Sequence, residues 1–177
     1  WDVLAREVDA TLATMPPGTR LLAGNFKIGA ELGFARGDAD IAVLDHPLNH
    51  KHGRAPQLAL WGLAHASRKS LGSEPLLLVA SSNDVDFREL LAHYHRLCEQ
   101  VGPLPPPRVL NIDHGRQRFL LFDLGTTRRA GPCTTPAMAF LDAPSPSATV
   151  GDSFEVAGWR WSMKPAAWST MRWSCRT

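Results

Sequence analysis

Hydrophobic and polar positions follow two periods that alternate along the first 130 residues. Apolar residues spaced by three and four predict helices over 3–15, 26–36, 56–67 and 86–101. Short continuous apolar runs predict buried strands over 21–23, 41–44 and 76–80, and two further strands are expected over 108–112 and 119–124. The last two are separated by a short polar turn and are expected to form a hairpin.

Each predicted helix is amphipathic and is expected to place one face on a sheet. The apolar stripes consist of Leu4, Val8, Leu12 and Met15 in the first helix, of Ile28, Leu32 and Ala35 in the second, and of Phe87, Leu90, Leu91, Tyr94, Leu97 and Val101 in the last. Strands that alternate with helices are typical of a mostly parallel sheet covered on both sides. We therefore predict an α/β domain, a three-layer sandwich with a mostly parallel sheet of about five strands.

We expect residues 1–130 to make up the whole of this α/β domain. Residues 131–151 are dense in Pro, Ser, Thr and Ala, which predicts an extended linker. Residues 152–177 begin with the alternating positions Phe154, Val156 and Trp159, as in the first strand of a β domain. Too few residues remain to complete such a domain, so we expect only its truncated start.

The pattern breaks after Trp159. Residues 160–177 contain Trp161, Trp168 and Trp173 among Ser, Met and Arg, without strand or helical periodicity. Read one base earlier in guanine- and cytosine-rich codons, this stretch can encode a strand, a turn and another strand. We hypothesise that a frameshift after residue 159 truncated a C-terminal β-sandwich, and codons incompatible with the shifted frame would contradict this hypothesis.

Composition narrows the class of function. The net charge is +2 with 20% charged residues, so no basic field points to a nucleic-acid partner. The longest apolar run, 76–80, is far shorter than the roughly 18 residues that cross a bilayer, so we expect a soluble fragment. The chain begins at Trp1 without an initiator Met or a signal peptide, and we expect that an upstream part has been removed.

The cysteines and one histidine pair predict no metal site. Cys98, Cys133 and Cys175 lack a Cys-x-x-Cys spacing and define neither a zinc site nor a disulfide framework, so they leave the cellular compartment open. His93 and His95 point to different faces of a helix, so they are expected at the surface and not as joint ligands. No cofactor is predicted.

Ligands of parallel α/β sheets bind at the carboxyl ends of the strands. Polar residues follow each predicted strand: Asn25 and Lys27, the loop 45–54, the loop 81–84, and Asp113 with His114. The loop 45–54 is the densest polar cluster, yet a zinc site needs three or four convergent ligands, and a solvated loop is the plain alternative. In that loop, Lys51 and Arg54 beside Asn49 suit a phosphate or a sugar hydroxyl.

Common catalytic motifs are absent from the sequence. There is no Gly-x-Ser-x-Gly elbow, no Gly-x-Gly-x-x-Gly fingerprint and no Gly-Lys-Ser/Thr phosphate loop. The segment 123–127, Asp-Leu-Gly-Thr-Thr, looks like the phosphate-binding turn of actin-like ATPases and sugar kinases, but it follows the last strand. We interpret it as a strand-ending turn, and we predict no catalytic residue.

Three segments together resemble a known family. They are 25–34 (Asn-Phe-Lys-Ile-Gly-Ala-Glu-Leu-Gly-Phe), the strand 41–44, and Asn49 followed by 54–61 (Arg-Ala-Pro-Gln-Leu-Ala-Leu-Trp). They resemble the extracytoplasmic C-terminal region of family 39-type membrane glycosyltransferases, which are similar to dolichyl-phosphate-mannose protein mannosyltransferases. The positions that fit the pattern are Glu31, Phe34, Asn49, Arg54, Gln57 and Trp61, within a match over about residues 20–62.

The resemblance implies the soluble extracytoplasmic module of a membrane glycosyltransferase that uses a polyprenyl-phosphate-linked sugar donor. The module would not be catalytic alone, because the acidic pair of that family belongs to an early loop. The implied partners are the membrane-embedded part of the same protein and a lipid-linked sugar or acceptor. The implied location is the periplasmic or extracytoplasmic face of the inner membrane.

The candidate substrate contacts are Asn25, Lys27, Asp45, Asn49, Lys51, Arg54 and Gln57. Plainer roles are open to some of the matching residues: we expect Phe34 and Trp61 in the core, and Arg54 has the alternative of pairing with an acid. Two other classes of function also stay open. One is a stand-alone α/β binding module for a nucleotide or phosphosugar that uses the same strand-end residues, and the other is a nonfunctional truncated product.

Overall fold

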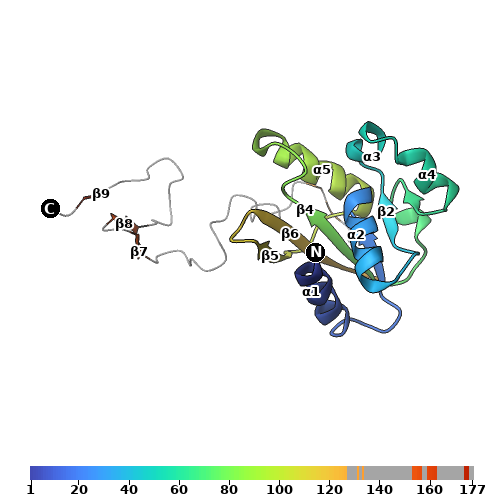
Figure 1. Ribbon diagram of the computed structural model, residues 1–177, viewed down its shortest axis with the longest axis horizontal. Helices are drawn as coiled ribbons and strands as arrows, with labels where there is room; N and C mark the ends of the chain where they lie inside the picture. Colours follow the sequence, from blue (N-terminus) through green and yellow to red (C-terminus); the bar gives the residue numbers. More distant parts are fainter. Residues whose placement is uncertain (127–130, 132, 134–152, 157–158, 163–173, 176–177) are drawn as a thin grey trace. The chain divides into compact units, whose positions relative to one another are not determined.

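The computed structural model describes residues 1–126, 131, 133, 153–156, 159–162 and 174–175 (Figure 1). The chain divides into two compact units, Trp1–Leu141 and Asp142–Thr177. The predicted linker, 131–151, lies outside the described residues apart from positions 131 and 133. None of the helices among the described residues combines the length and the apolarity needed to span a membrane.

The first unit has a mixed α/β fold around a six-stranded sheet in the order β3-β2-β1-β4-β6-β5 (Figure 1). The strands are β1 (Arg20–Ala23), β2 (Ala42–Leu44), β3 (Ala64–His65), β4 (Leu76–Ser81), β5 (Arg108–Ile112) and β6 (Gln117–Gly125). The four strands from β3 to β4 pair in parallel, whereas β6 runs antiparallel to β4 and to β5. The predicted α/β class and mostly parallel sheet are confirmed, with one short strand, β3, beyond those expected.

The α-helices among the described residues are α1 (Asp2–Leu12), α2 (Phe26–Arg36), α3 (Pro47–Lys51), α4 (Ala55–Leu60) and α5 (Leu90–Val101), with 3₁₀ turns at Arg68–Ser70 and Phe87–Glu89. Helices cover both faces of the sheet. On one face, Leu4 of α1 and Ile28 of α2 pack with Leu77 of β4. On the other face, Leu97 of α5 packs with Leu78 of β4. The continuous apolar run of β4 follows from this burial on both sides.

Two glycines let helix α2 lie close to its neighbours: Gly29 faces the sheet, and Gly33 faces the chain that follows the helix. A Cβ added to Gly29 would come within 2.8 Å of Val43 Cγ2 on β2. A Cβ added to Gly33 would come within 2.8 Å of the Asp38 carbonyl oxygen. Both distances are shorter than carbon atoms tolerate, so a methyl group at either position would force the helix or its neighbour to shift.

Two predicted elements differ from the structure between residues 45 and 67. The loop 45–54 contains the short helix α3, and the helix predicted over 56–67 ends at Leu60. Gly62 adopts a left-handed conformation, and the Leu63 N–H donates to the Leu58 carbonyl oxygen over 2.9 Å. This is the hydrogen bond of a Schellman C-cap, which turns the chain from α4 into β3.

The hairpin prediction is confirmed. Strands β5 and β6 pair from Arg108–Leu121 to Ile112–Gln117. The turn between them takes positive φ angles at Asp113, His114 and Gly115, and short polar residues and glycine tolerate this conformation best. Strand β6 ends at Gly125, as expected of a strand-ending turn, and the Asp123 carboxylate accepts a hydrogen bond from the Gly125 N–H over 2.9 Å.

The described parts of the second unit form a three-stranded antiparallel sheet of β7 (Ser153–Val156), β8 (Trp159–Ser162) and β9 (Ser174–Cys175). The expected first strand at residues 153–156 is therefore present. The prediction of no strand after residue 159 is wrong for β8 and β9. Large and polar residues do alternate over Trp-Arg-Trp-Ser at 159–162, a short strand period that the irregular residues after it obscured.

Candidate functional site

Asn25 begins helix α2 directly after strand β1, at the edge of the sheet where ligands of α/β folds bind. The residue is buried, and its side-chain oxygen accepts from the Lys27 N–H at 2.9 Å and the Ile28 N–H at 3.2 Å. Its amide group donates to the Asp84 carboxylate, 2.5 Å away in the loop after β4. Asn25 is therefore an N-cap that also ties β1 to β4.

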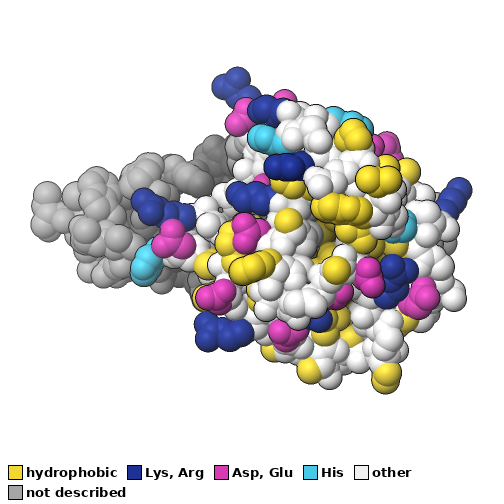
Figure 2. All heavy atoms as spheres, turned by 45° about the vertical axis from the view of Figure 1, so that its right-hand side comes forward, with side chains coloured by type: hydrophobic (Ala, Val, Ile, Leu, Met, Phe, Trp, Pro, Cys, Tyr) yellow, Lys and Arg dark blue, Asp and Glu magenta, His cyan; other side chains and the backbone are white. Residues whose placement is uncertain are grey.

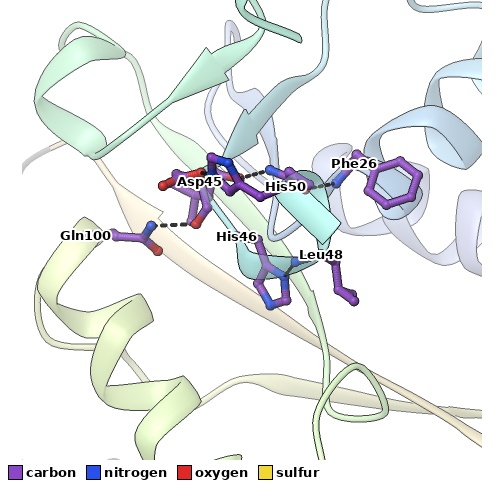
Figure 3. Close-up of polar contacts among 8 residues, drawn as sticks. Phe26, Asp45, His46, Leu48, His50 and Gln100 are labelled. Carbon is purple, nitrogen blue, oxygen red and sulfur yellow. Dashed lines mark hydrogen bonds and ion pairs between the residues drawn. The ribbon is translucent and has the colours of Figure 1, made fainter. Parts of the chain in front are cut away.

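Asn49 also supports the start of α2. Its side-chain oxygen accepts from the Phe26 N–H at 2.9 Å, and its amide donates to the Leu44 carbonyl oxygen at 2.9 Å (Figure 3). The residue lies buried in α3. Because Asn25 and Asn49 together accept from Phe26, Lys27 and Ile28, the free N–H groups at this helix N-terminus are already bonded inside the protein. A phosphate would have to displace these bonds to bind there.

Asp45 follows strand β2 and holds two neighbouring elements. Its carboxylate accepts from His50 Nε2 at 2.6 Å, and its backbone carbonyl accepts from Gln100 Nε2 of α5 at 2.8 Å (Figure 3). The side chains of Asp45 and His50 are both more than half exposed. This pair therefore links α3 and α5 near the surface, and Lys51, which follows His50, is also exposed.

Asp84 was not among the predicted site residues, although it lies at the same edge. Burial is the main cause that raises the pKa of its carboxyl group above the usual value, while the hydrogen bond from Asn25 and the charge of Lys27 oppose the shift. Lys27 is exposed, and its Nζ lies 5.6 Å from the ring centroid of Trp1. The sequence places both Asn25 and the loop 81–84 at strand ends, but it does not show that Asn25 and Asp84, 59 positions apart, bond to each other.

His46 and His93 form a buried pair between α3 and α5. Their rings meet edge to face, with centroids 5.3 Å apart. Within the described residues, His46 Nε2 and both ring nitrogens of His93 have no hydrogen-bond partner. The surface position predicted for His93 is therefore wrong, because this residue lies on the face of α5 that packs under α3.

The hydrogen bonds of His46 decide which of its nitrogens carries the proton. Nδ1 accepts from the Leu48 N–H at 3.1 Å, so a neutral ring has its proton on Nε2 (Figure 3). A protonated nitrogen does not bind a metal ion. Burial lowers the pKa of His46 and, most strongly, that of His93, to about 4, so both rings are neutral at pH 7.

A groove of about 900 Å³ opens beside α2 and α4. The buried side chains of Ile41, Val43 and Leu58 form its floor. Figure 2, which brings the side of α4 forward, shows hydrophobic side chains gathered on the exposed face of the molecule. Phe34 of α2 and Trp61, which ends α4, line the groove and are 90% and 59% exposed.

The expected core positions of Phe34 and Trp61 are therefore wrong. Phe34 sits on the outer side of α2, where the helix no longer contacts the sheet, and Trp61 follows the short helix α4, which ends before it can cover the ring. Two exposed aromatic rings that line one groove make it a candidate interaction site. In the sequence, only the family resemblance, whose pattern includes both residues, pointed to a role for Phe34 and Trp61 in a site.

Arg54, Gln57, Asp38 and Asp40 supply polar groups to the groove. The Arg54 guanidinium has a long contact of 3.5 Å to the Gln57 side-chain oxygen. In the part of the chain that the structure describes, no carboxylate lies within ion-pair distance of Arg54, so the alternative of an acid partner is not found. The cation is exposed and available to an anion or a hydroxyl group.

The structure thus separates the predicted site residues. Arg54 and Gln57 meet in the groove, together with Phe34 and Trp61. Asn25 and Asn49 act inside the fold, and Lys27, Asp45 and Lys51 lie outside the groove lining. Among the described residues, no three His, Cys, Asp or Glu side chains are grouped closely enough to hold a metal ion.

One covalent link was missed from the sequence: Cys98 of α5 and Cys133 form a disulfide, with Cα atoms 5.6 Å apart. The two cysteines are 35 positions apart, and their spacing fits no known motif.

Comparisons of the chain with models of protein families, with curated proteins and with solved structures found no match.

Proposed function

We propose that this chain is the extracytoplasmic module of a membrane glycosyltransferase that uses a polyprenyl-phosphate-linked sugar, and that the groove beside α2 and α4 contacts that substrate or its acceptor. One observation carries the proposal. Phe34, Arg54, Gln57 and Trp61, four of the positions that match the family pattern, come from two separate segments and line one groove. Residues that only stabilised the core would not meet at the surface with their rings exposed.

The chemistry of the groove suits a phosphorylated or glycosylated ligand. The Arg54 guanidinium is planar and offers several N–H donors to a phosphate or to neighbouring hydroxyl groups. The Gln57 amide both donates and accepts hydrogen bonds. The exposed ring faces of Phe34 and Trp61 offer flat apolar surfaces against which the C–H groups of a sugar pack.

The proposal gives this chain a binding role and leaves catalysis to the membrane-embedded part of the same protein. The disulfide between Cys98 and Cys133 supports the extracytoplasmic location, because disulfides persist in oxidising compartments and are rare in reducing ones. In the proposed arrangement, the sheet and its helices form a three-layer module.

Amide chemical shifts test the proposal. The full chain is titrated with a short-chain polyprenyl-phosphate sugar, and we expect shifts at residues 54–61 and around Phe34. Arg54→Gln should weaken binding by about tenfold, the effect of one charge-assisted hydrogen bond of about 1.5 kcal/mol. The control is Arg116→Gln, because Arg116 is an exposed arginine on the β5–β6 hairpin and is not part of the groove lining.

Three other outcomes would each count against the proposal. Shifts at residues 24–28 and 82–84 would instead place a phosphosugar at the carboxyl edge of the sheet, the second class of function. If Arg54→Gln and Arg116→Gln weakened binding equally, the binding would be a nonspecific attraction between charges. If the amide spectrum showed a folded chain and no residue shifted, the remaining interpretation would be a structural role or a nonfunctional product.

A further inference from the structure

Three large hydrophobic side chains are exposed on α2 and at the end of α4, and two of them, Phe34 and Trp61, line the groove. Phe34 of α2 is 90% exposed, Leu60 at the end of α4 is 83% exposed, and Trp61 beside it is 59% exposed. We call these three residues the apolar rim. We propose that the apolar rim inserts into the surface of a lipid bilayer, so that the groove opens at the level of the lipid headgroups.

The shape of the rim favours a bilayer over a protein partner. A stable protein interface buries about 800 Å² on each partner and needs a broad, complementary surface. The rim instead consists of three exposed side chains, and two of them, Phe34 and Trp61, line a hollow of about 900 Å³. Lipid chains and headgroups are fluid and fill the space around such side chains without a matching surface.

The residue types also fit the boundary between lipid and water. A tryptophan combines an apolar ring with an N–H donor and is enriched at membrane interfaces, where leucine and phenylalanine reach further into the hydrocarbon. Two exposed cations, Lys51 and Arg54, lie just before α4, and neither has a carboxylate partner within the described residues. Such side chains reach toward lipid phosphates while their apolar stems stay near the surface.

The groove also contains Asp38 and Asp40, so its charge is mixed. Attraction to anionic lipids is therefore partly cancelled, and insertion of the three apolar side chains must supply most of the binding. Two consequences follow. Binding should occur on zwitterionic vesicles as well as anionic ones, and it should survive high salt, which screens charges and leaves apolar burial intact.

Co-sedimentation of the full chain with vesicles tests the inference without any sugar donor, so its result is independent of the proposed substrate. The vesicles are made of phosphatidylcholine, with or without phosphatidylglycerol. The triple variant F34S/L60S/W61S should bind at least about tenfold more weakly than the natural chain, since each lost side chain removes buried apolar area. The matched control is V3S/L91S, which changes two exposed hydrophobic residues outside the rim, 42% and 59% exposed, and should bind like the natural chain.

Quenching by brominated lipids locates the contact. Brominated phosphatidylcholine should quench the fluorescence of the natural chain more than that of Trp61→Phe, because Trp61 would then lie among the lipid chains. The inference is overturned if the natural chain stays in the supernatant with both kinds of vesicle, or if the triple variant sediments equally well. It is also overturned if sedimentation velocity shows a dimer that the triple variant loses, because a second copy then covers the rim.

Discussion

The side-chain amide of Asn25 donates to the carboxylate of Asp84 over 2.5 Å, and this bond joins the ends of the two central parallel strands, β1 and β4. The strand order runs away from this pair in both directions, toward β2 on one side and β6 on the other. Folds of this kind usually bind ligands at such a switch point. Here a carboxylate of the protein itself occupies the place beside the α2 N-terminus.

Two substitutions at Asp84 separate its hydrogen bond from its charge. Asp84→Asn keeps an oxygen for Asn25, whereas Asp84→Ala leaves the buried Asn25 amide without an acceptor. We expect Asp84→Ala to be less stable than Asp84→Asn by about 1–2 kcal/mol at pH 7, measured by urea unfolding. Equal stabilities of the two variants would mean that the bond contributes nothing.

The contribution of Asp84 to the free energy of unfolding should change with pH in one direction. Burial raises the pKa of Asp84, so the folded protein holds this proton more tightly than the unfolded chain does. The stability that Asp84 contributes therefore decreases as the pH rises from its ordinary value of 3.8 through the raised pKa. Urea unfolding at several pH values should therefore show the natural chain losing stability relative to Asp84→Asn as the pH rises through this range, because the variant keeps every other titrating group.

Asn49 should matter more for stability than its exposed neighbour. Asn49→Ala removes the acceptor of the Phe26 N–H and the donor to the Leu44 carbonyl, so we expect a loss of about 2–4 kcal/mol in the free energy of unfolding. His50→Ala removes only a surface pair with Asp45 and should cost at most about 1 kcal/mol. Thermal or urea unfolding of the two variants checks the order, and the reverse order would contradict the bridging role of Asn49.

Acidification should destabilise the contact between α3 and α5. Burial is the main cause that lowers the pKa of His93 to about 4 from the ordinary 6.5, with the neighbouring His46 and Arg96 adding to the shift. The unfolded chain then binds protons that the folded protein resists, so the stability decreases as the pH falls from 6.5 toward 4.

His93→Phe tests this sign, because phenylalanine fills the site without titrating. In urea unfolding between pH 7.5 and 4.5, the variant should lose less stability than the natural chain. His95→Gln on the same helix is the control and should keep the natural slope. Identical slopes for His93→Phe and the natural chain would show that this histidine does not titrate within the fold.

The disulfide between Cys98 and Cys133 should stabilise the first unit. A link that closes a loop of this length contributes about 2–4 kcal/mol, chiefly by restricting the unfolded chain. We therefore expect the double variant C98S/C133S to unfold at lower urea concentration by that amount, while Cys175→Ser behaves like the natural chain. Mass spectrometry of peptides from the unreduced protein should recover the Cys98–Cys133 link, and its absence would contradict the pairing.

Much of the fold could be predicted because its long elements have a clear period. Helix 26–36 and strand 108–112 were predicted with the bounds that the structure has. The period does not show where a helix loses contact with the sheet, so Ala35 and Leu91 were expected to be buried and are exposed. The period also does not reveal which glycine takes a left-handed conformation. The helix predicted over 56–67 is therefore shorter in the structure, where Gly62 ends it.

The candidate site could be predicted only in part, because its contacts are tertiary. Arg54 and Gln57 are three positions apart on one helical turn, so the sequence could group them. Their meeting with Phe34 depends on how α2 and α4 pack across β2, which no local pattern contains. The role of Asn25 as a helix cap, rather than as a substrate contact, likewise depends on its distant partner Asp84.

Gly29 of α2 influences the width of the groove. Since Gly29 leaves no room for a methyl group against Val43, the height of α2 above the sheet is fixed by a missing side chain. An alanine at this position would lift or tilt the helix and carry Phe34 with it, and the width of the hollow between α2 and α4 would change. The space open to a ligand thus depends on the absence of a side chain where α2 meets the floor of the groove.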